Sequence, residues 1–186
     1  MSETLETILN RRSIRNYKQE QITDEELHTI LKAGQYAPSA KNEQSWHFSV
    51  VQNKEVLDKI STIIKSNFEN SGNPILEERA RIKDFSPFHH APTLIILSGD
   101  DKAIAPQADA SLALGNTFLA AAALKIGSCW IHSLRSLLDS NEGKSLKQVL
   151  GIPEGYSILG SGAFGYNAAQ TPGAAPRKEG TITIIK

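Results

Sequence analysis

The chain has 186 residues, with 20 basic and 20 acidic side chains and a formal net charge of zero. This balance gives no broad positive field, so neither nucleic acid nor an anionic membrane is expected as a partner. A single cysteine, Cys129, excludes an internal disulfide, and no apolar run approaches the roughly 20 residues that span a bilayer. Residues 1–10 lack the pattern of a signal peptide. The sequence therefore predicts one globular domain, residues 1–186, in the cytoplasm.

The first predicted element is a short amphipathic helix, in which Leu5, Ile8 and Leu9 share one face. It leads into Arg11-Arg12-Ser13-Ile14-Arg15, where three guanidinium groups and a hydroxyl fall within five residues. Like charges this close repel one another unless an anion lies among them, and the forked donors of arginine match phosphate oxygens in pairs. The cluster therefore indicates a phosphate site, although a solvated basic turn would also explain it.

A capping box at Thr23 and Glu26 predicts a second helix, from Asp24 to Gln35. The helix leads into the loop Ala37-Pro38-Ser39-Ala40-Lys41-Asn42-Glu43-Gln44-Ser45-Trp46. Small side chains, a proline that restricts the backbone, and amide and hydroxyl donors suit close approach to a polar planar ligand. An ordinary polar turn is the alternative.

The next predicted elements are a strand at residues 48–51 and a helix at residues 55–68. The polar stretch 69–87 is predicted to be a mobile excursion with one exposed helix, which could cover a pocket. His89 and His90 follow in what reads as an extended segment, where adjacent side chains point in opposite directions. No metal site is predicted there, because no cysteine or acidic ligand accompanies the two histidines.

Residues 93–98 are predicted to form a strand buried on both faces. Pro106 opens the longest helix, to Ile126, with Asp109 in its first turn. Apolar residues cover nearly the whole circumference of this helix, so burial requires either a second subunit or a central place in a monomeric core. One apolar stripe consists of Ala108, Leu112, Gly115, Leu119 and Ala122.

The C-terminal third is predicted to contain a strand at 128–132, a short helix at 146–150 and strands at 158–164 and 181–185. Gly160, Gly162 and Gly165 are expected to let the backbone approach a ligand. Residues 168–175 form a proline and alanine linker that leads to Pro176-Arg177-Lys178.

Four of these stretches together resemble the flavin-dependent nitroreductase family: residues 11–15, residues 37–46, Gly127-Ser128-Cys129-Trp130-Ile131 and Pro176-Arg177. The resemblance implies an α+β fold with a central, mostly antiparallel sheet flanked by helices. It also implies an intertwined homodimer with two FMN sites at the subunit interface. The chain departs from the family at Ser45 and at Asn167, where the family often has proline, and the first departure leaves the rigidity of the loop open.

The resemblance further implies a division of the cofactor-binding residues between the subunits. Residues that would hold the phosphate, ribityl chain and pyrimidine edge of FMN are Arg11, Arg12, Ser13, Arg15 and Arg177. Residues that would come from the other subunit are Pro38, Ser39, Ala40 and Asn42. The backbone around Cys129, Trp130 and Ile131 would line the isoalloxazine ring. No side chain is assigned as an essential acid or base, although Tyr36, Lys41 and His132 are near the proposed site in the sequence.

By this resemblance the protein is an oxidoreductase that passes electrons from NAD(P)H through flavin N5 to an electron-poor small molecule, such as a nitroaromatic or a quinone. One open flavin face would serve donor and acceptor in turn, which implies ping-pong kinetics. Two alternatives stay open: a flavin store or sensor without NAD(P)H turnover, and a specialised relative that removes halide or modifies flavin. Residues 69–87, where family members differ most, leave the acceptor unassigned.

Overall fold

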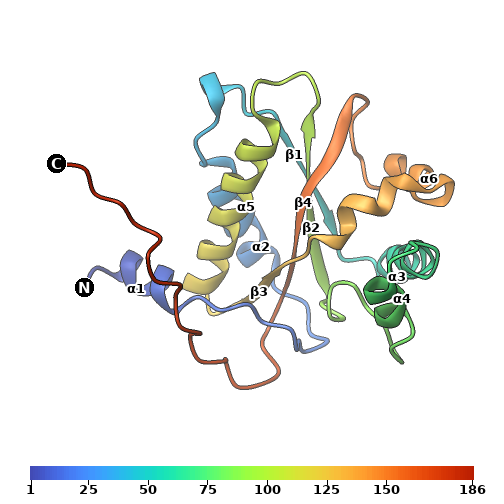
Figure 1. Ribbon diagram of the computed structural model, residues 1–186, viewed down its shortest axis with the longest axis horizontal. Helices are drawn as coiled ribbons and strands as arrows, with labels where there is room; N and C mark the ends of the chain where they lie inside the picture. The colour runs from blue at the N-terminus through green and yellow to red at the C-terminus, as the bar shows by residue number, and fades with distance from the viewer.

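The computed structural model describes residues 1–186 and has a four-stranded antiparallel sheet at its centre (Figure 1). The strands are β1 (Trp46–Val51), β2 (Thr93–Asp100), β3 (Gly127–Trp130) and β4 (Tyr156–Gly165), in the order β1-β2-β4-β3. In the register, Val50 lies opposite Ile95 and Leu97 opposite Gly160, and the pairing of β2 with β4 shifts after Leu97. Every pair is antiparallel, which confirms the predicted sheet.

Helices cover both faces of the sheet. They are α1 (Glu3–Asn10), α2 (Asp24–Gln35), α3 (Lys54–Glu69), α4 (Pro74–Ala80), α5 (Pro106–Ala123) and α6 (Asn141–Val149), with the short 3-10 helices η1 (Ala40–Asn42) and η2 (Ser133–Asp139). Because side chains alternate along a strand, Ile95 and Leu97 of β2 pack against α2 and α5, whereas Leu94 and Ile96 pack against α3, α6 and η2. None of the helices has the length and hydropathy to cross a bilayer.

The predicted helices are present, and the first capped helix has the predicted bounds. The Thr23 N–H donates to Glu26 Oε2 at 2.8 Å, and Thr23 Oγ1 accepts from the Glu26 N–H at 3.2 Å, so the capping box is complete. Other ends differ from the prediction: β1 begins at Trp46, α6 begins at Asn141, α5 ends at Ala123 and β3 ends at Trp130. The polar excursion contains one helix, α4, which buries Ala80.

The longest helix, α5, buries only one of its sides. Its buried residues are Asp109, Ala110, Ala113, Leu114, Thr117, Phe118 and Ala121. The apolar stripe of the sequence lies on the other side, where Leu112 is 49% exposed and a Cβ on Gly115 would meet nothing within 4 Å. The core therefore covers one side of the helix and leaves an apolar face open, which disagrees with a central core helix in a monomer, and burial of this face by a second subunit stays a prediction.

The terminal strand predicted at residues 181–185 is absent from the single chain. No strand follows β4, and Ile182, Ile184 and Ile185 are between 75% and 92% exposed. β-branched residues favour a strand only where a neighbouring strand accepts their hydrogen bonds and packs on one face. The segment instead leaves the sheet and runs past α1 to the chain end (Figure 1).

Two local expectations are also wrong. A Cβ on Gly162 would lie 2.7 Å from the rings of Phe118 and Phe164, and one on Gly165 would meet Pro92, so these glycines make room for side chains rather than for a ligand. His89 and His90 have φ angles of 59° and 55°, which places them in a turn and not in an extended segment.

Candidate functional site

The basic turn, residues 11–15, follows α1 directly and is hydrogen-bonded to the start of β3. The Ile14 N–H donates to the Ser128 carbonyl at 2.9 Å, and Ser13 forms a parallel bridge with Ser128. Gly127 permits this approach, because a Cβ there would lie 2.9 Å from the Ile14 side chain. The fold therefore brings together two stretches that are more than 100 residues apart and that the sequence assigned to one ligand.

The three arginines of the turn have different surroundings. Arg12 Nη1 donates to the carbonyls of Leu9 at 2.7 Å and Arg11 at 2.8 Å, so this guanidinium satisfies backbone groups at the end of α1, and its buried Nε has no partner. Arg11 and Arg15 form no salt bridge. The chain has two ion pairs, and both lie within α3. Two unpaired cations therefore remain available to an anion.

The positive charge of the turn acts on Cys129 in β3. Burial raises the pKa of the Cys129 thiol, and Arg15, a hydrogen bond with Ser13, and Arg11 oppose that rise. Burial is also the main cause that raises the pKa of Tyr17, with Cys129 adding to the rise and Arg15 opposing it. The next residue, Trp130, is 38% exposed and packs on Phe118 with 6.2 Å between ring centroids. Ring, thiol and guanidinium groups thus surround one end of β3.

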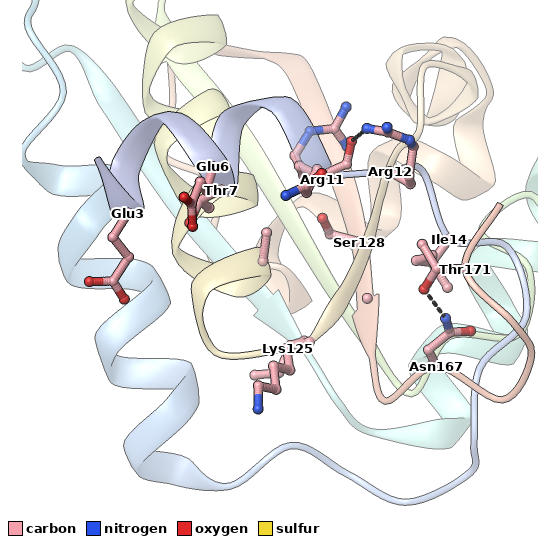
Figure 2. Close-up of a pocket in the computed structure, with 14 residues that line it drawn as sticks. Glu3, Glu6, Thr7, Arg11, Arg12, Ile14, Lys125, Ser128, Asn167 and Thr171 are labelled. Atoms are coloured by element: carbon pink, nitrogen blue, oxygen red, sulfur yellow. Dashed lines mark hydrogen bonds between the residues drawn. The ribbon is translucent and has the colours of Figure 1, made fainter. Parts of the chain in front are cut away.

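A cleft of about 380 Å³ lies between α1, the end of α5 and the basic turn (Figure 2). Arg11 and Ser128 line it together with Lys125, whose position beyond the helix end nothing in the sequence indicated. Glu3 and Glu6 line the same cleft from α1, as Figure 2 shows. The cleft therefore combines cations with carboxylates, which weaken its attraction for an anion.

A second cleft, of about 480 Å³, lies on the Arg15 side of the turn. Arg79 of the polar excursion lines this cleft, and the following turn contributes His89, so the stretch borders a pocket, whereas its mobility and its role as a cover stay predictions. Burial lowers the pKa of His89, and the charges of Arg15, Arg79 and His90 lower it further. Asp84 is the one acidic residue of this cleft, where it faces Arg15 and Arg79, so both clefts carry a small positive formal charge.

The loop of residues 37–46 lies at the other end of α5 (Figure 1). The Ala40 N–H donates to Asp109 Oδ1 at 3.0 Å, in the first turn of that helix, whereas the basic turn contacts β3 beyond its last turn. With a rise of about 1.5 Å per residue, the 14 steps from Asp109 to Ala123 span about 20 Å. One chain therefore does not bring Pro38, Ser39, Ala40 and Asn42 to Arg11–Arg15.

Two further predicted groups form no hydrogen bond with the turn. Arg177 lies in the exposed C-terminal segment, and no hydrogen bond or ion pair joins it to another residue. The Ile131 side chain is buried, and its N–H donates to the Ser161 carbonyl at 2.8 Å within the sheet. No group of three or more histidine, cysteine or acidic side chains is arranged to hold a metal ion.

Sequence reasoning missed two residues that shape the loop end. Ser45 is buried, and its Oγ donates to Asp109 Oδ2 at 3.3 Å, so both carboxylate oxygens of Asp109 serve the loop. The sequence offered one signal for this contact: a carboxylate within a helix whose other inward residues are almost all apolar. A favourable charge in the helix dipole is the only role that the sequence indicates for this carboxylate.

The antiparallel sheet, the helices on both faces and the basic turn at β3 define an α+β protein. The Nitroreductase family model matches residues 8–166, so the chain belongs to the nitroreductase family. This confirms the family and fold predicted from the motifs.

Solved structures agree over the full length. A nitroreductase with bound FMN from Bacteroides fragilis has a TM-score of 0.94 and 39% identity, and covers 100% of both chains. A nitroreductase with bound FMN from Desulfitobacterium hafniense has a TM-score of 0.92 and 27% identity, again over 100% of both chains.

Sequence relatives include a protein of Archaeoglobus fulgidus with the provisional name NADH dehydrogenase/NAD(P)H nitroreductase. It is 36% identical over 171 residues, which are 89% of this chain and 86% of that protein. The FMN reductase (NADPH) of Bacillus subtilis is 28% identical over 188 residues, or 95% of this chain and 70% of the relative.

Proposed function

We propose that the protein is an FMN-dependent oxidoreductase that takes electrons from NAD(P)H and delivers them to an electron-poor small molecule, such as a nitroaromatic or a quinone. Membership of the nitroreductase family supports this proposal, as do the FMN in the Bacteroides fragilis structure and the named activity of the Bacillus subtilis relative. FMN, when bound, supplies the hydride chemistry, while the protein supplies position and electrostatics.

The residues at the basic turn fit the phosphate of FMN. Arg11 and Arg15 have no carboxylate partner, and Ser13 adds a short hydroxyl donor between them. Guanidinium groups that lack a protein partner gain most from a dianion, because the charge-assisted bonds replace only water. Arg12 is the weaker candidate, since its Nη1 already serves the end of α1.

The observation that carries the proposal is the separation of the two predicted halves of the site. The loop meets Asp109 in the first turn of α5, and the basic turn meets Ser128 beyond the helix end, so about 20 Å of helix lies between them. A flavin that contacts both must therefore lie between two chains. The exposed apolar stripe on α5 gives such a homodimer a surface to bury.

A short experiment tests this function. The purified protein should be yellow and release FMN, and it should oxidise NADH or NADPH in the presence of a nitroarene or a quinone. Parallel lines in double-reciprocal plots are expected if one flavin face serves donor and acceptor in turn. Bound FMN without NAD(P)H oxidation would favour a flavin store or sensor, and a protein that binds no FMN would contradict the proposal.

A further inference from the structure

Asp109 is the one charged side chain among the buried residues of the chain, and it is 3% exposed. It lies in the first turn of α5, and the N-cap residue of this helix, Ala105, provides no side-chain cap. Burial of a carboxylate costs free energy unless hydrogen bonds satisfy its oxygens. The partners of Asp109 therefore indicate what the residue does.

Both partners belong to the loop, at its two ends. Ala40, which opens η1, donates its N–H to Oδ1 at 3.0 Å, and Ser45, which precedes β1, donates its hydroxyl to Oδ2 at 3.3 Å. The Gln44 N–H donates to Ser39 Oγ at 3.0 Å and closes the loop between these ends. One carboxylate thus clamps the segment of residues 39–45 to the start of α5.

The clamped segment has an unusual backbone. Lys41, Asn42 and Gln44 have φ angles of 49°, 56° and 48°, in the left-handed region that side chains disfavour. Such residues persist only where the surrounding structure determines their conformation. The bonds to Asp109 provide this determination at Ala40 and Ser45, on either side of the three residues.

We propose that Asp109 is a positioning residue that holds residues 39–42 in the conformation that meets the flavin, and that the hydroxyl of Ser45 is part of the same restraint. The inference deepens the proposed function and rests on it for the identity of the ligand.

Three variants test the restraint, and each is compared with the exposed Asp101→Asn, whose side chain forms no hydrogen bond. Asp109→Ala leaves two donors without an acceptor, and it should weaken FMN binding by about 10- to 100-fold. Asp109→Asn keeps an acceptor for the Ala40 N–H, and Ser45→Ala removes one bond, so each should weaken binding by roughly 3- to 10-fold. Most of the loss should appear in the rate of FMN dissociation, because the basic turn that attracts the phosphate is unchanged.

Hydrogen exchange of the flavin-free protein gives a second readout. The Ala40 amide should exchange faster in Asp109→Ala than in wild type, whereas amides in the middle of α5 should keep their protection. This measurement needs no flavin, so it tests the clamp even if the wild-type protein binds no FMN and the proposed function fails.

The same measurements can also overturn the proposal. If Asp109→Asn and Ser45→Ala fold with wild-type FMN affinity, or if a folded Asp109→Ala shows unchanged exchange at Ala40, the proposal is overturned, whatever happens to the melting temperature. If Asp109→Ala does not fold, these two milder variants still decide the question, because each retains a polar or small side chain in the same space.

Discussion

The polar groups at the two ends of α5 differ in whether they have partners within the chain. At the N-terminal end, Asp109 accepts hydrogen bonds from Ala40 and Ser45, and the loop is satisfied within the chain. At the C-terminal end, Arg11 and Arg15 have no acidic partner, and the charge of the turn acts on Cys129 and His89 instead. One end is complete without a ligand, whereas the other requires an anion to balance its charge.

This difference indicates how the site is divided. The loop is shaped in advance and can meet a flat ring without reorganisation, which lowers the entropic cost of binding. The turn provides attraction, and a phosphate would offset the repulsion among its cations. Because α5 keeps the two regions about 20 Å apart, a site that contains both requires two chains.

The largest expected effect comes from removing the two cations that attract the phosphate. Arg11→Ala combined with Arg15→Ala should leave a folded protein that has lost FMN. Each charge-assisted bond contributes about 1.5 to 3 kcal/mol, so the dissociation constant should rise by roughly two to four powers of ten. Fluorescence titration with FMN measures the change, and Arg135→Ala with Lys144→Ala, both exposed, is the matched control. Unchanged FMN occupancy in the first variant would remove the turn from the site.

The next effect concerns the open face of α5. Leu112→Glu places a charge in the apolar stripe, and an uncompensated buried charge costs roughly 3 to 5 kcal/mol, so the dimer should dissociate at micromolar concentration. Val149→Glu changes a more exposed apolar residue, 62% against 49% for Leu112, on α6 and should leave the assembly intact. Sedimentation of both variants decides the matter, and a wild-type protein that is monomeric would contradict the prediction outright.

A smaller effect separates packing from ligand binding on β4. Gly162→Ala introduces a Cβ that would lie 2.7 Å from Phe118 and Phe164, and overpacking of this kind costs about 1 to 3 kcal/mol of unfolding free energy. FMN affinity should be unchanged, because no open space for a ligand faces this glycine. Urea unfolding with Gly173→Ala as the control, whose Cβ would meet nothing, measures the cost. Normal stability with weakened FMN binding would restore the ligand role.

The smallest effect is on pH dependence. Burial and the nearby cations lower the pKa of His89, so between that pKa and about 6.5 the unfolded chain binds more protons than the folded one. The stabilising contribution of His89 to the free energy of unfolding is fully present above the pKa of His89 in the unfolded chain. It is lost as the pH falls through the pKa of His89 in the folded protein. Urea unfolding at pH 7 and pH 5 should therefore show a smaller loss for His89→Gln than for wild type or for the exposed His28→Gln. FMN should raise the pKa of His89, since its phosphate would offset Arg15.

Much of the fold could be predicted from local signals. The capping box set the bounds of α2, and the buried run of residues 93–98 marked the central strand, because both patterns depend on neighbours in the sequence. Pro106 likewise marked the start of α5. For the site, the arginine cluster and the polar loop were recognisable as separate motifs.

What the sequence did not reveal depends on contacts between distant residues. The apolar residues of 181–185 have strand propensity but no neighbouring strand in the chain, and the apolar circumference of α5 does not tell which side faces the core. The glycines of β4 face aromatic rings that only the fold brings near. The clamp at Asp109 joins residues 69 and 64 positions apart, so no local pattern contains it.

The most direct test of a shared site mixes two defective chains. One chain has Arg11→Ala and Arg15→Ala, and the other has Ser39→Pro and Asn42→Ala. In a refolded equal mixture about half of the dimers contain both chains, and each of these should have one intact site and one with both defects. The mixture should therefore oxidise NAD(P)H at about one quarter of the wild-type rate, although both parents are inactive. A mixture no more active than either parent would show that each site is built within a single chain.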